Sequence, residues 1–218
     1  MILTRTEINK LIREKKLLFS PQLDRYQSQP HAVDLRLGAT FYVSRPWEIT
    51  QRGREILTVS PFSSEKNYEI IEIKPGQFFE LSPGESIIAS SLEKITLHSP
   101  NIMGVLYPRS SVNRRGLSVD MTGIIDANYS GHLMVPLLNK TSSQIIRIYP
   151  GERFCQIIFH TLSRPLSAAE AQRHGVKNAK YHLSKTHKLE KKSDDASEIE
   201  FIKKGNLSGL KAQKKLFN

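Results

Sequence analysis

The feature that most constrains the fold is a series of short β-rich runs between about residues 32 and 162. Turn signals such as Pro83-Gly84 and Pro150-Gly151 separate the runs, and no amphipathic helical pattern lies between them. Many short strands without intervening helices predict a mainly β fold, either a distorted barrel or a jelly-roll-like sandwich. Five of the expected strands are Tyr68–Ile73, Ser86–Ser90, Gly104–Tyr107, Leu133–Leu138 and Ile145–Tyr149.

The N-terminal segment follows a different pattern. Residues 4–17 are predicted to form a short helix, which a capping box between Thr4 and Glu7 begins. Its apolar residues recur at helical spacing: Leu3, Ile8, Leu11 and Ile12. We expect this helix to cover one end of the core.

The C-terminal part of the chain has a weaker pattern. Residues 165–175 are expected to be helical or irregular, because several alanines favour a helix there. Beyond residue 184 the chain is rich in Lys, Ser and Asp and has few large apolar residues. We therefore expect one domain over residues 1–185, followed by a flexible basic tail over residues 186–218 with at most one weak helix.

Composition places the chain among ordinary globular proteins, with 39% hydrophobic and 24% charged residues. No apolar stretch approaches the roughly 20 residues that a membrane-spanning helix needs, and no secretory signal is recognisable. The single cysteine, Cys155, lies in an apolar run and is expected to be a buried, inert thiol. These features fit a cytoplasmic protein.

The formal net charge of +11 indicates a polyanionic partner. Basic proteins often bind nucleic acid, but a small polyphosphate is an equally suitable partner. The sequence contains no zinc-finger spacing and no RNA-binding aromatic motif, so we do not expect nucleic acid. Most of the charge lies in the body, because residues 186–218 contribute eight Lys and five Asp/Glu, a net +3.

Polar residues in four segments could carry chemistry. Asp34 and Arg36 interrupt an apolar strand in the first segment, and Pro150–Gln156 forms the fourth. In the second, Arg109, Ser110 and Ser111 follow Pro108 and together offer a guanidinium fork, hydroxyl groups and backbone N–H groups. These groups suit phosphate oxygens, although an Arg-Ser-Ser turn is also common on protein surfaces.

The third segment, residues 122–131, is predicted to be a hairpin with Asp126 at its turn. The backbone at the mouth of such a hairpin could hydrogen-bond the edge of a nucleobase. Alternatively, Asp126 and Asn128 are simply turn formers, because both side chains hydrogen-bond to local backbone.

Taken together and in this order, the four segments resemble the motifs of the trimeric dUTPase and dCTP deaminase superfamily, over roughly residues 1–185. The matching pieces are Asp-Leu-Arg, Pro-Arg-Ser-Ser, Gly-Ile-Ile-Asp-x-x-Tyr-x-Gly and Pro-Gly-Glu-Arg-x-x-Gln. The segments Val33–Gly38 and Asn178–Tyr181 look specifically like the dCTP deaminase branch. The resemblance implies a dUTPase-like distorted β-barrel (a β-clip fold) that assembles as a homotrimer with sites between subunits.

The resemblance also implies roles for individual residues. Asp126 would be catalytic: it would hydrogen-bond the 3′-hydroxyl of the deoxyribose and orient the attacking water. Tyr129 would pack under the sugar, and backbone atoms of Thr122, Gly123 and Ile125 would read the pyrimidine. The triphosphate would bring Mg²⁺, with no metal ligand required from the protein. The other nucleotide-binding residues would be Arg109, Ser110, Ser111, Arg114, Gln156, Lys180 and Tyr181.

The choice between the two reactions depends on Pro136. The deaminase branch uses a glutamate as proton shuttle in the strand after the hairpin, and Pro136 occupies that position here. Proline has no carboxylate and cannot transfer a proton. The zinc-dependent deaminase signature is also missing from the sequence.

We therefore expect a dUTP diphosphatase that forms dUMP and pyrophosphate. The alternatives are a dCTP deaminase with another proton carrier, or a non-catalytic relative that only binds deoxynucleotides. The glycine-rich C-terminal motif of dUTPases is absent as well. The basic segment 180–188 stands in its place and could either close over phosphates or remain a solvated tail.

Overall fold

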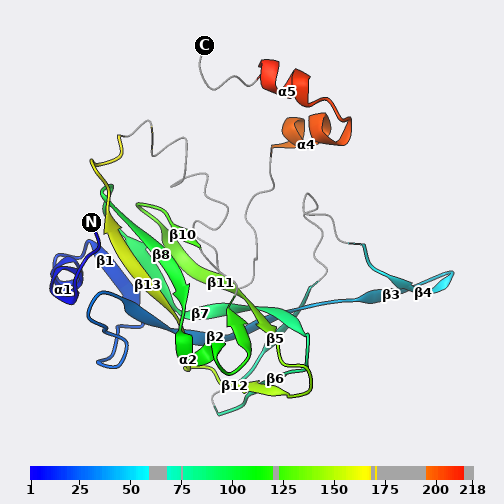
Figure 1. The fold of residues 1–218 in the computed structure, drawn as a ribbon, viewed down its shortest axis with the longest axis horizontal. Helices are drawn as coiled ribbons and strands as arrows, with labels where there is room; N and C mark the ends of the chain where they lie inside the picture. The colour runs from blue at the N-terminus through cyan, green and yellow to red at the C-terminus, as the bar shows by residue number, and fades with distance from the viewer. Residues whose placement is uncertain (59–67, 75, 120–122, 168–169, 171–194, 214–218) are drawn as a thin grey trace.

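The computed structural model describes residues 1–58, 68–74, 76–119, 123–167, 170 and 195–213. Its centre is a nine-stranded sheet with the strand order β10-β8-β13-β2-β7-β11-β9, in which β1 also pairs with β7 and β5 with β2. The sheet curls, so that β8, β10 and β13 lie across the layer formed by β2, β7 and β11 (Figure 1). The strands are β1 (Leu17–Ser20), β2 (Val33–Ser44), β5 (Tyr68–Glu72), β7 (Ser86–Leu97), β8 (Ile102–Pro108), β9 (Leu117–Val119), β10 (Ile124–Ile125), β11 (Ser130–Asn139) and β13 (Arg153–Thr161).

Two small sheets complete the β structure. One pairs β6 (Phe79–Leu81) with β12 (Ile146–Ile148), and the other pairs β3 (Trp47–Thr50) with β4 (Gly53–Ile56). The mainly β fold expected from the turn-separated runs is therefore confirmed. Two of the expected strands are much longer than the sequence pattern suggested, because β7 and β11 extend across the curled sheet.

Alternating burial explains why β11 forms a strand. Its residues alternate between half-buried and buried along the whole length, and Val135 and Leu137 are fully buried in the core. The core continues across β2, β7 and β13, where Phe41, Ile95 and Phe159 have no exposed surface. Cys155 is buried on β13, as expected.

The N-terminal helix is shorter than expected. α1 spans Arg5–Arg13 and begins with the expected capping box, in which Thr4 N donates to a Glu7 carboxylate oxygen at 2.7 Å. The expected extension to residue 17 is wrong. The chain leaves the helix at Lys15, which has a φ of 57°, and the N–H groups of Lys15 and Lys16 donate to Ile12 O and Leu11 O. Leu17 is then buried in β1.

The expected hairpin around Asp126 is also wrong. β10 pairs with β8, whereas β11 pairs with β7 and β9, so the two strands that flank this turn are not neighbours. The turn instead carries the chain from one layer of the curled sheet to the other. Asn128 makes the reversal with a φ of 63°, a conformation that asparagine tolerates better than most residues.

The C-terminal part contains more helix than expected. α4 spans Ala196–Lys203 and α5 spans Leu207–Gln213, so the expectation of at most one helix in the tail is wrong. Asp195 caps α4, because its carboxylate accepts hydrogen bonds from the N–H groups of Ser197 and Glu198. Most of the expected excursion at 165–175 lies outside the described residues. None of the helices in the described ranges has the length and apolar character needed to cross a bilayer.

Candidate active site

The second motif lies where β8 ends. Strand β8 stops at Pro108, and Arg109 precedes the short helix α2 (Ser110–Asn113). The side chains of Ser110, Ser111 and Arg114 are exposed around this helix. Gln156 lies on the neighbouring strand β13, opposite Tyr107 of β8. The structure therefore brings the predicted phosphate-binding residues of the described chain to one end of β8.

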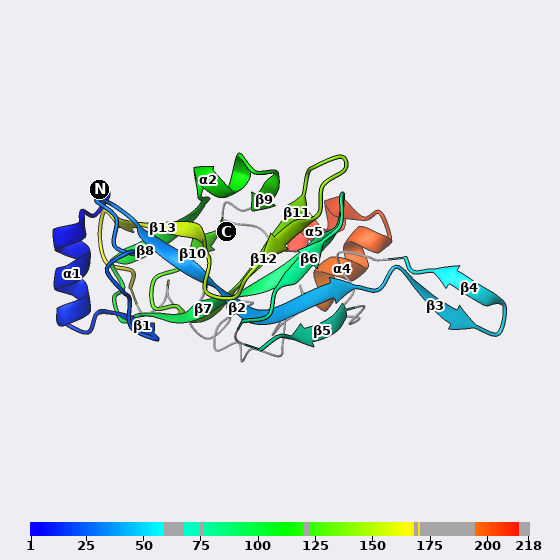
Figure 2. The same cartoon turned by 90° about the horizontal axis from the view of Figure 1, so that it is seen from below.

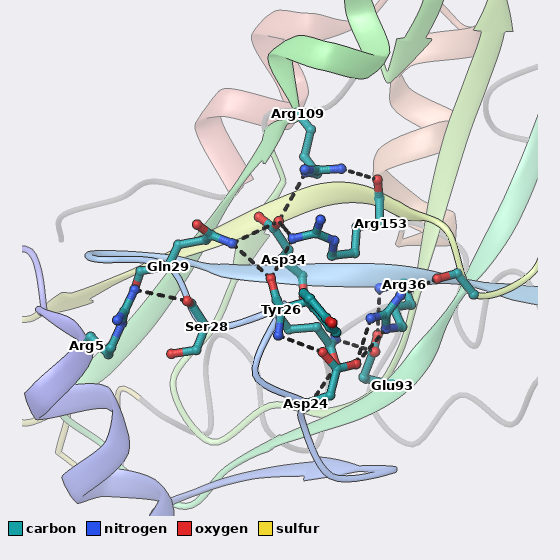
Figure 3. A network of polar contacts seen from close by, with 12 residues as sticks. Arg5, Asp24, Tyr26, Ser28, Gln29, Asp34, Arg36, Glu93, Arg109 and Arg153 are labelled. Carbon is teal, nitrogen blue, oxygen red and sulfur yellow. Dashed lines mark hydrogen bonds and ion pairs between the residues drawn. The ribbon is translucent and has the colours of Figure 1, made fainter.

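Arg109 is held by a buried carboxylate. The Asp34 side chain on β2 is only 3% exposed, and its Oδ2 atom lies 3.1 Å from Arg109 Nε and 3.2 Å from Arg153 Nη1. Arg109 Nη1 also donates to the carbonyl oxygen of Arg153 at 2.8 Å. Figure 3 shows Asp34 between the two guanidinium groups. This pairing fixes the direction of Arg109 before any ligand is bound.

The arrangement leaves positive charge at this end of β8. One carboxylate faces two guanidinium groups, so the cluster of Asp34, Arg109 and Arg153 has a net charge of about +1 when the carboxyl group is ionised. Burial raises the pKa of the Asp34 carboxyl group, and the two arginines act in the opposite direction. Exposed Arg114 adds a further positive charge. Such a site can attract a polyphosphate.

The third motif lies at the other end of β8. Asp126 is exposed immediately after β10, and its carbonyl oxygen accepts a hydrogen bond from Tyr129 N at 3.1 Å. Tyr129 is buried in the core cluster, and its hydroxyl group donates to His132 O at 3.0 Å. The buried ring anchors the turn and thereby positions the Asp126 carboxylate at the surface.

β10 provides a backbone edge beside Asp126. It is the last strand of the sheet path, so its outward edge has no strand partner among the described residues. Its inward edge pairs Ile125 with Gly104, and the carbonyl oxygen of Gly123 accepts from Leu106 N at 2.9 Å. An unpaired strand edge can donate to and accept from the hydrogen-bonding edge of a pyrimidine. Thr122 lies outside the described residues, as do Lys180 and Tyr181.

Within one copy of the chain, the two halves of the expected site lie far apart. Ile125 is opposite Gly104 of β8, and Arg109, directly after the end of β8, is five positions after Gly104 in the sequence. At about 3.3 Å per residue, Ile125 and Arg109 are roughly 16 Å apart along the strand direction, and Asp126 lies one residue farther away. The structure brings the phosphate-binding residues together and brings Asp126 and Tyr129 together, but it does not bring these two groups together within one copy.

Pro136 lies on the outward face of β11. It is half-buried, whereas its neighbours Val135 and Leu137 are fully buried in the core. It is opposite Ile88 of β7. A longer polar side chain at this position would extend away from the core.

Glu93 of β7 is a buried acid, 1% exposed, that was not among the site residues expected from the sequence. Its carboxylate accepts hydrogen bonds from Gln27 Nε2 at 2.7 Å and from Arg36 N at 3.0 Å (Figure 3). Burial raises its pKa, and these hydrogen bonds oppose that effect. Glu93 alternates in phase with the buried Ile95 and Leu97, and this pattern could have revealed it.

This raised pKa predicts a stability difference that depends on pH. A carboxyl group with a raised pKa binds its proton more tightly in the folded state, so it contributes less stability as the pH rises above its ordinary 4.5. Relative to Glu93→Gln, the wild-type free energy of unfolding should therefore fall with rising pH. The fall should level off once the pH exceeds the raised pKa of Glu93 in the folded protein. Urea unfolding of both proteins between pH 4.5 and 8 measures this difference in the free energy of unfolding. Parallel pH profiles for the two proteins would contradict a raised pKa for Glu93.

Comparison with known proteins decides the family. The family model described as "dCTP deaminase-like" matches residues 2–162. The chain belongs to the dCTP deaminase-like family. Residues 2–162 include all four motifs and Pro136, so the resemblance to the dUTPase and dCTP deaminase superfamily is confirmed.

Curated relatives extend this match over most of the chain. A protein of Dictyoglomus thermophilum named "dCTP deaminase, dUMP-forming" is 35% identical over 187 residues, which is 85% of this chain and 91% of the relative. A protein of Persephonella marina with the same name is 35% identical over 166 residues, or 76% of this chain and 86% of the relative. A "dCTP deaminase" of Hyperthermus butylicus is 30% identical and covers 77% of this chain and 89% of its own.

A solved structure supports the fold. The 2′-deoxycytidine 5′-triphosphate deaminase of Agrobacterium tumefaciens superposes with a TM-score of 0.58 at 23% identity. The match covers 79% of this chain but only 51% of the Agrobacterium chain, about half its length. The dUTPase-like β fold expected for the family is confirmed.

These relatives correct the expected reaction. They are named as enzymes, which supports the expectation that this chain is one. The expectation of a plain dUTPase is wrong, because the matching relatives are named as dCTP deaminases, most of them dUMP-forming. The absence of a carboxylate at position 136 favoured hydrolysis over deamination on the basis of one residue, whereas the match to deaminases extends over 187 residues.

Proposed function

We propose that this protein is a dCTP deaminase of the dUMP-forming kind. The observation that carries the proposal is the match to relatives of that name over 85% of this chain and 91% of the relative's length. In the overall reaction, dCTP and two water molecules give dUMP, ammonia and pyrophosphate. One water replaces the amino group of the cytosine ring, and the other cleaves the bond between the α-phosphorus and the bridging oxygen of the leaving pyrophosphate.

The two ends of β8 suggest how the nucleotide is bound. We assign the triphosphate to Arg109, Ser110, Ser111, Arg114 and Gln156, where the charge is positive. We assign the sugar to Asp126 and Tyr129, and the base to the outward edge of β10. Asp126 is the only carboxylate among these assigned residues, so it would orient the water that attacks the α-phosphorus.

The separation of the two ends supports a homotrimer. A nucleotide cannot span the roughly 16 Å along β8 while its sugar and phosphates both lie close to the protein. If the Asp126 end of one copy adjoins the Arg109 end of the next, each site is complete between two subunits. Closed symmetry would then generate equivalent sites from a single type of contact.

We propose that Mg²⁺ enters with the nucleotide. In the described ranges, no group of three or more His, Cys, Asp or Glu side chains could hold a metal ion on its own. In this proposal, triphosphate oxygens hold most of the coordination sphere of the ion. When bound, the ion would neutralise charge that develops on the phosphates, while arginine and serine side chains would position them.

Pro136 favours a second candidate function. A relative that lacks a proton carrier at this strand position could bind dCTP without deaminating it. The side chain of Pro136 is on the outward face of β11, so no core rearrangement is needed to explain the loss of a carboxylate there. Such a protein would be a sensor or a reservoir of deoxynucleotide.

One assay separates these functions. Purified protein is incubated with dCTP and Mg²⁺, and ammonia, dUMP and pyrophosphate are quantified, with CTP as a control for the sugar. Equal amounts of the three products support the proposed enzyme. Binding of dCTP in calorimetry without ammonia release supports the second candidate. If the protein neither binds dCTP nor converts it, both candidate functions are wrong.

A further inference from the structure

Strand β2 runs between β13 and β7 in the nine-stranded sheet (Figure 2). Its ladder with β7 begins at the pair Leu37 and Ser91 and continues toward the end of β2. Before Leu37, two buried polar side chains take the place of this ladder. Gln27, from the segment between β1 and β2, is 2% exposed, and Glu93 of β7 is 1% exposed. Buried polar groups almost always have hydrogen-bond partners, and here those partners lie around Asp34.

Gln27 and Glu93 together hold the backbone of β2. Asp34 N donates to the carbonyl oxygen of Gln27 at 2.8 Å, and Gln27 Nε2 donates to the carbonyl oxygen of Asp34 at 3.0 Å. The same amide nitrogen donates to Glu93 Oε1 at 2.7 Å, and Glu93 Oε2 accepts from Arg36 N at 3.0 Å (Figure 3). Hydrogen bonds to an ionised carboxylate are stronger than neutral ones. The two side chains therefore fix the stretch of β2 that carries Asp34.

The Asp34 carboxylate connects this backbone to the phosphate-binding residues. Its Oδ2 atom lies 3.1 Å from Arg109 Nε, 3.2 Å from Arg153 Nη1 and 3.3 Å from Gln29 Nε2. Because the aspartate side chain is short, its carboxylate moves with the backbone that carries it. Hydrogen bonds weaken steeply when their geometry is lost, so a small displacement of β2 would release Arg109 from its present direction. The Arg109 side chain is 24% exposed, so a ligand can reach it from the surface.

We infer that Gln27 and Glu93 are positioning residues for triphosphate binding. They hold β2 where the Asp34 carboxylate directs Arg109 toward the ligand, and both are buried beneath the site rather than part of its surface. The inference rests on the proposed function in one respect, because it needs a triphosphate at Arg109. It does not depend on which base reacts. Loss of either residue should therefore lower the affinity for the triphosphate and leave the chemical step largely unchanged.

Replacing Gln27 with methionine tests the first of these residues. Methionine has a similar length and fills a buried site well, but it cannot donate to Asp34 or Glu93. Calorimetry with inorganic tripolyphosphate and Mg²⁺ should show binding to the full-length variant about tenfold weaker than to the wild type. The KM for dCTP should rise by a similar factor, while kcat should stay within about twofold of the wild-type value.

The matched control is Ile87→Val, which removes one methylene group from the core on the same strand as Glu93. Ile87 is 1% exposed and packs in the core cluster, so the variant loses stability without changing the hydrogen bonds around Asp34. Its affinity for tripolyphosphate should stay within about twofold of the wild-type value. All titrations are made at a temperature at which circular dichroism shows every variant folded. Equal affinities of Gln27→Met and Ile87→Val would overturn the inference.

Two substitutions of Glu93 give a graded test. Glu93→Gln keeps one acceptor oxygen and should bind tripolyphosphate more tightly than Glu93→Leu, which keeps none. The reverse order, or no loss in either variant, would contradict a positioning role. A wild-type protein that does not bind tripolyphosphate would overturn the inference as well. If the wild type binds tripolyphosphate but leaves dCTP unchanged, the proposed function is wrong, and the affinities of the variants still decide this inference.

Discussion

Replacing Pro136 with glutamate is expected to increase ammonia release from dCTP by about 100- to 10,000-fold, the usual contribution of a positioned general acid or base. The new carboxylate would lie on the outward face of β11, where it displaces no core side chain. There it could accept a proton from the attacking water and return it to the leaving amine. Single-turnover kinetics with dCTP measure the rate.

The matched control for this gain is Pro136→Gln. Its glutamine side chain has almost the same size as glutamate, and it also restores a backbone N–H. It cannot carry a proton, so its ammonia release should stay at the wild-type level. An equal gain in both variants would mean that removing the backbone constraint of proline, rather than proton transfer, is responsible for the faster ammonia release. No gain in either variant would mean that position 136 does not face the cytosine ring.

Replacing Asp126 with asparagine is expected to reduce dUMP formation by about 100- to 10,000-fold while the affinity for dCTP changes much less. The amide keeps the size of the side chain, but it cannot activate or orient water as a carboxylate does. Because the Asp126 side chain is exposed, the midpoint of thermal unfolding should be nearly unchanged. Product analysis by chromatography gives the rate, and calorimetry gives the affinity.

Two results would contradict this role. A variant that still forms dUMP at the wild-type rate would show that Asp126 is only a turn former. If Asp126→Asn abolishes dCTP binding as well as turnover, the carboxylate contributes mainly to holding the nucleotide. Replacing the neighbouring Asn128 with glycine is a suitable control, because glycine adopts its φ of 63° without strain.

The sequence predicted those parts of the molecule that depend on local chemistry. Three features could be predicted because each depends on residues only a few positions apart: the capping box of α1, the β-rich body and the four motifs. The residue at which α1 ends could not be predicted, because Lys15 adopts a left-handed conformation that glycine adopts more often. The path of the chain after Asp126 could not be predicted from the sequence either. A strand–turn–strand pattern normally indicates a hairpin, and only long-range pairing with β7 and β8 shows otherwise.

The candidate site was predictable in its residues but not in its geometry. Arg109 and the serines were identified from their phosphate-binding chemistry, yet nothing in the sequence shows that Asp34 holds Arg109 from a strand 75 positions earlier. Glu93 was missed because a single acid among small and apolar residues gives a weak signal. The reaction was wrongly predicted because one absent side chain was given more weight than the similarity of the whole chain.

The placement of the two half-sites at opposite ends of β8 has a genetic consequence under the proposed assembly. A chain with a damaged Arg109 keeps an intact Asp126, and the converse holds for a chain damaged at Asp126. Two inactive variants, once mixed and reassembled, could therefore rescue each other by pairing their undamaged ends. Each heteromeric ring would contain at least one working pocket, whereas rings of either variant alone would contain none.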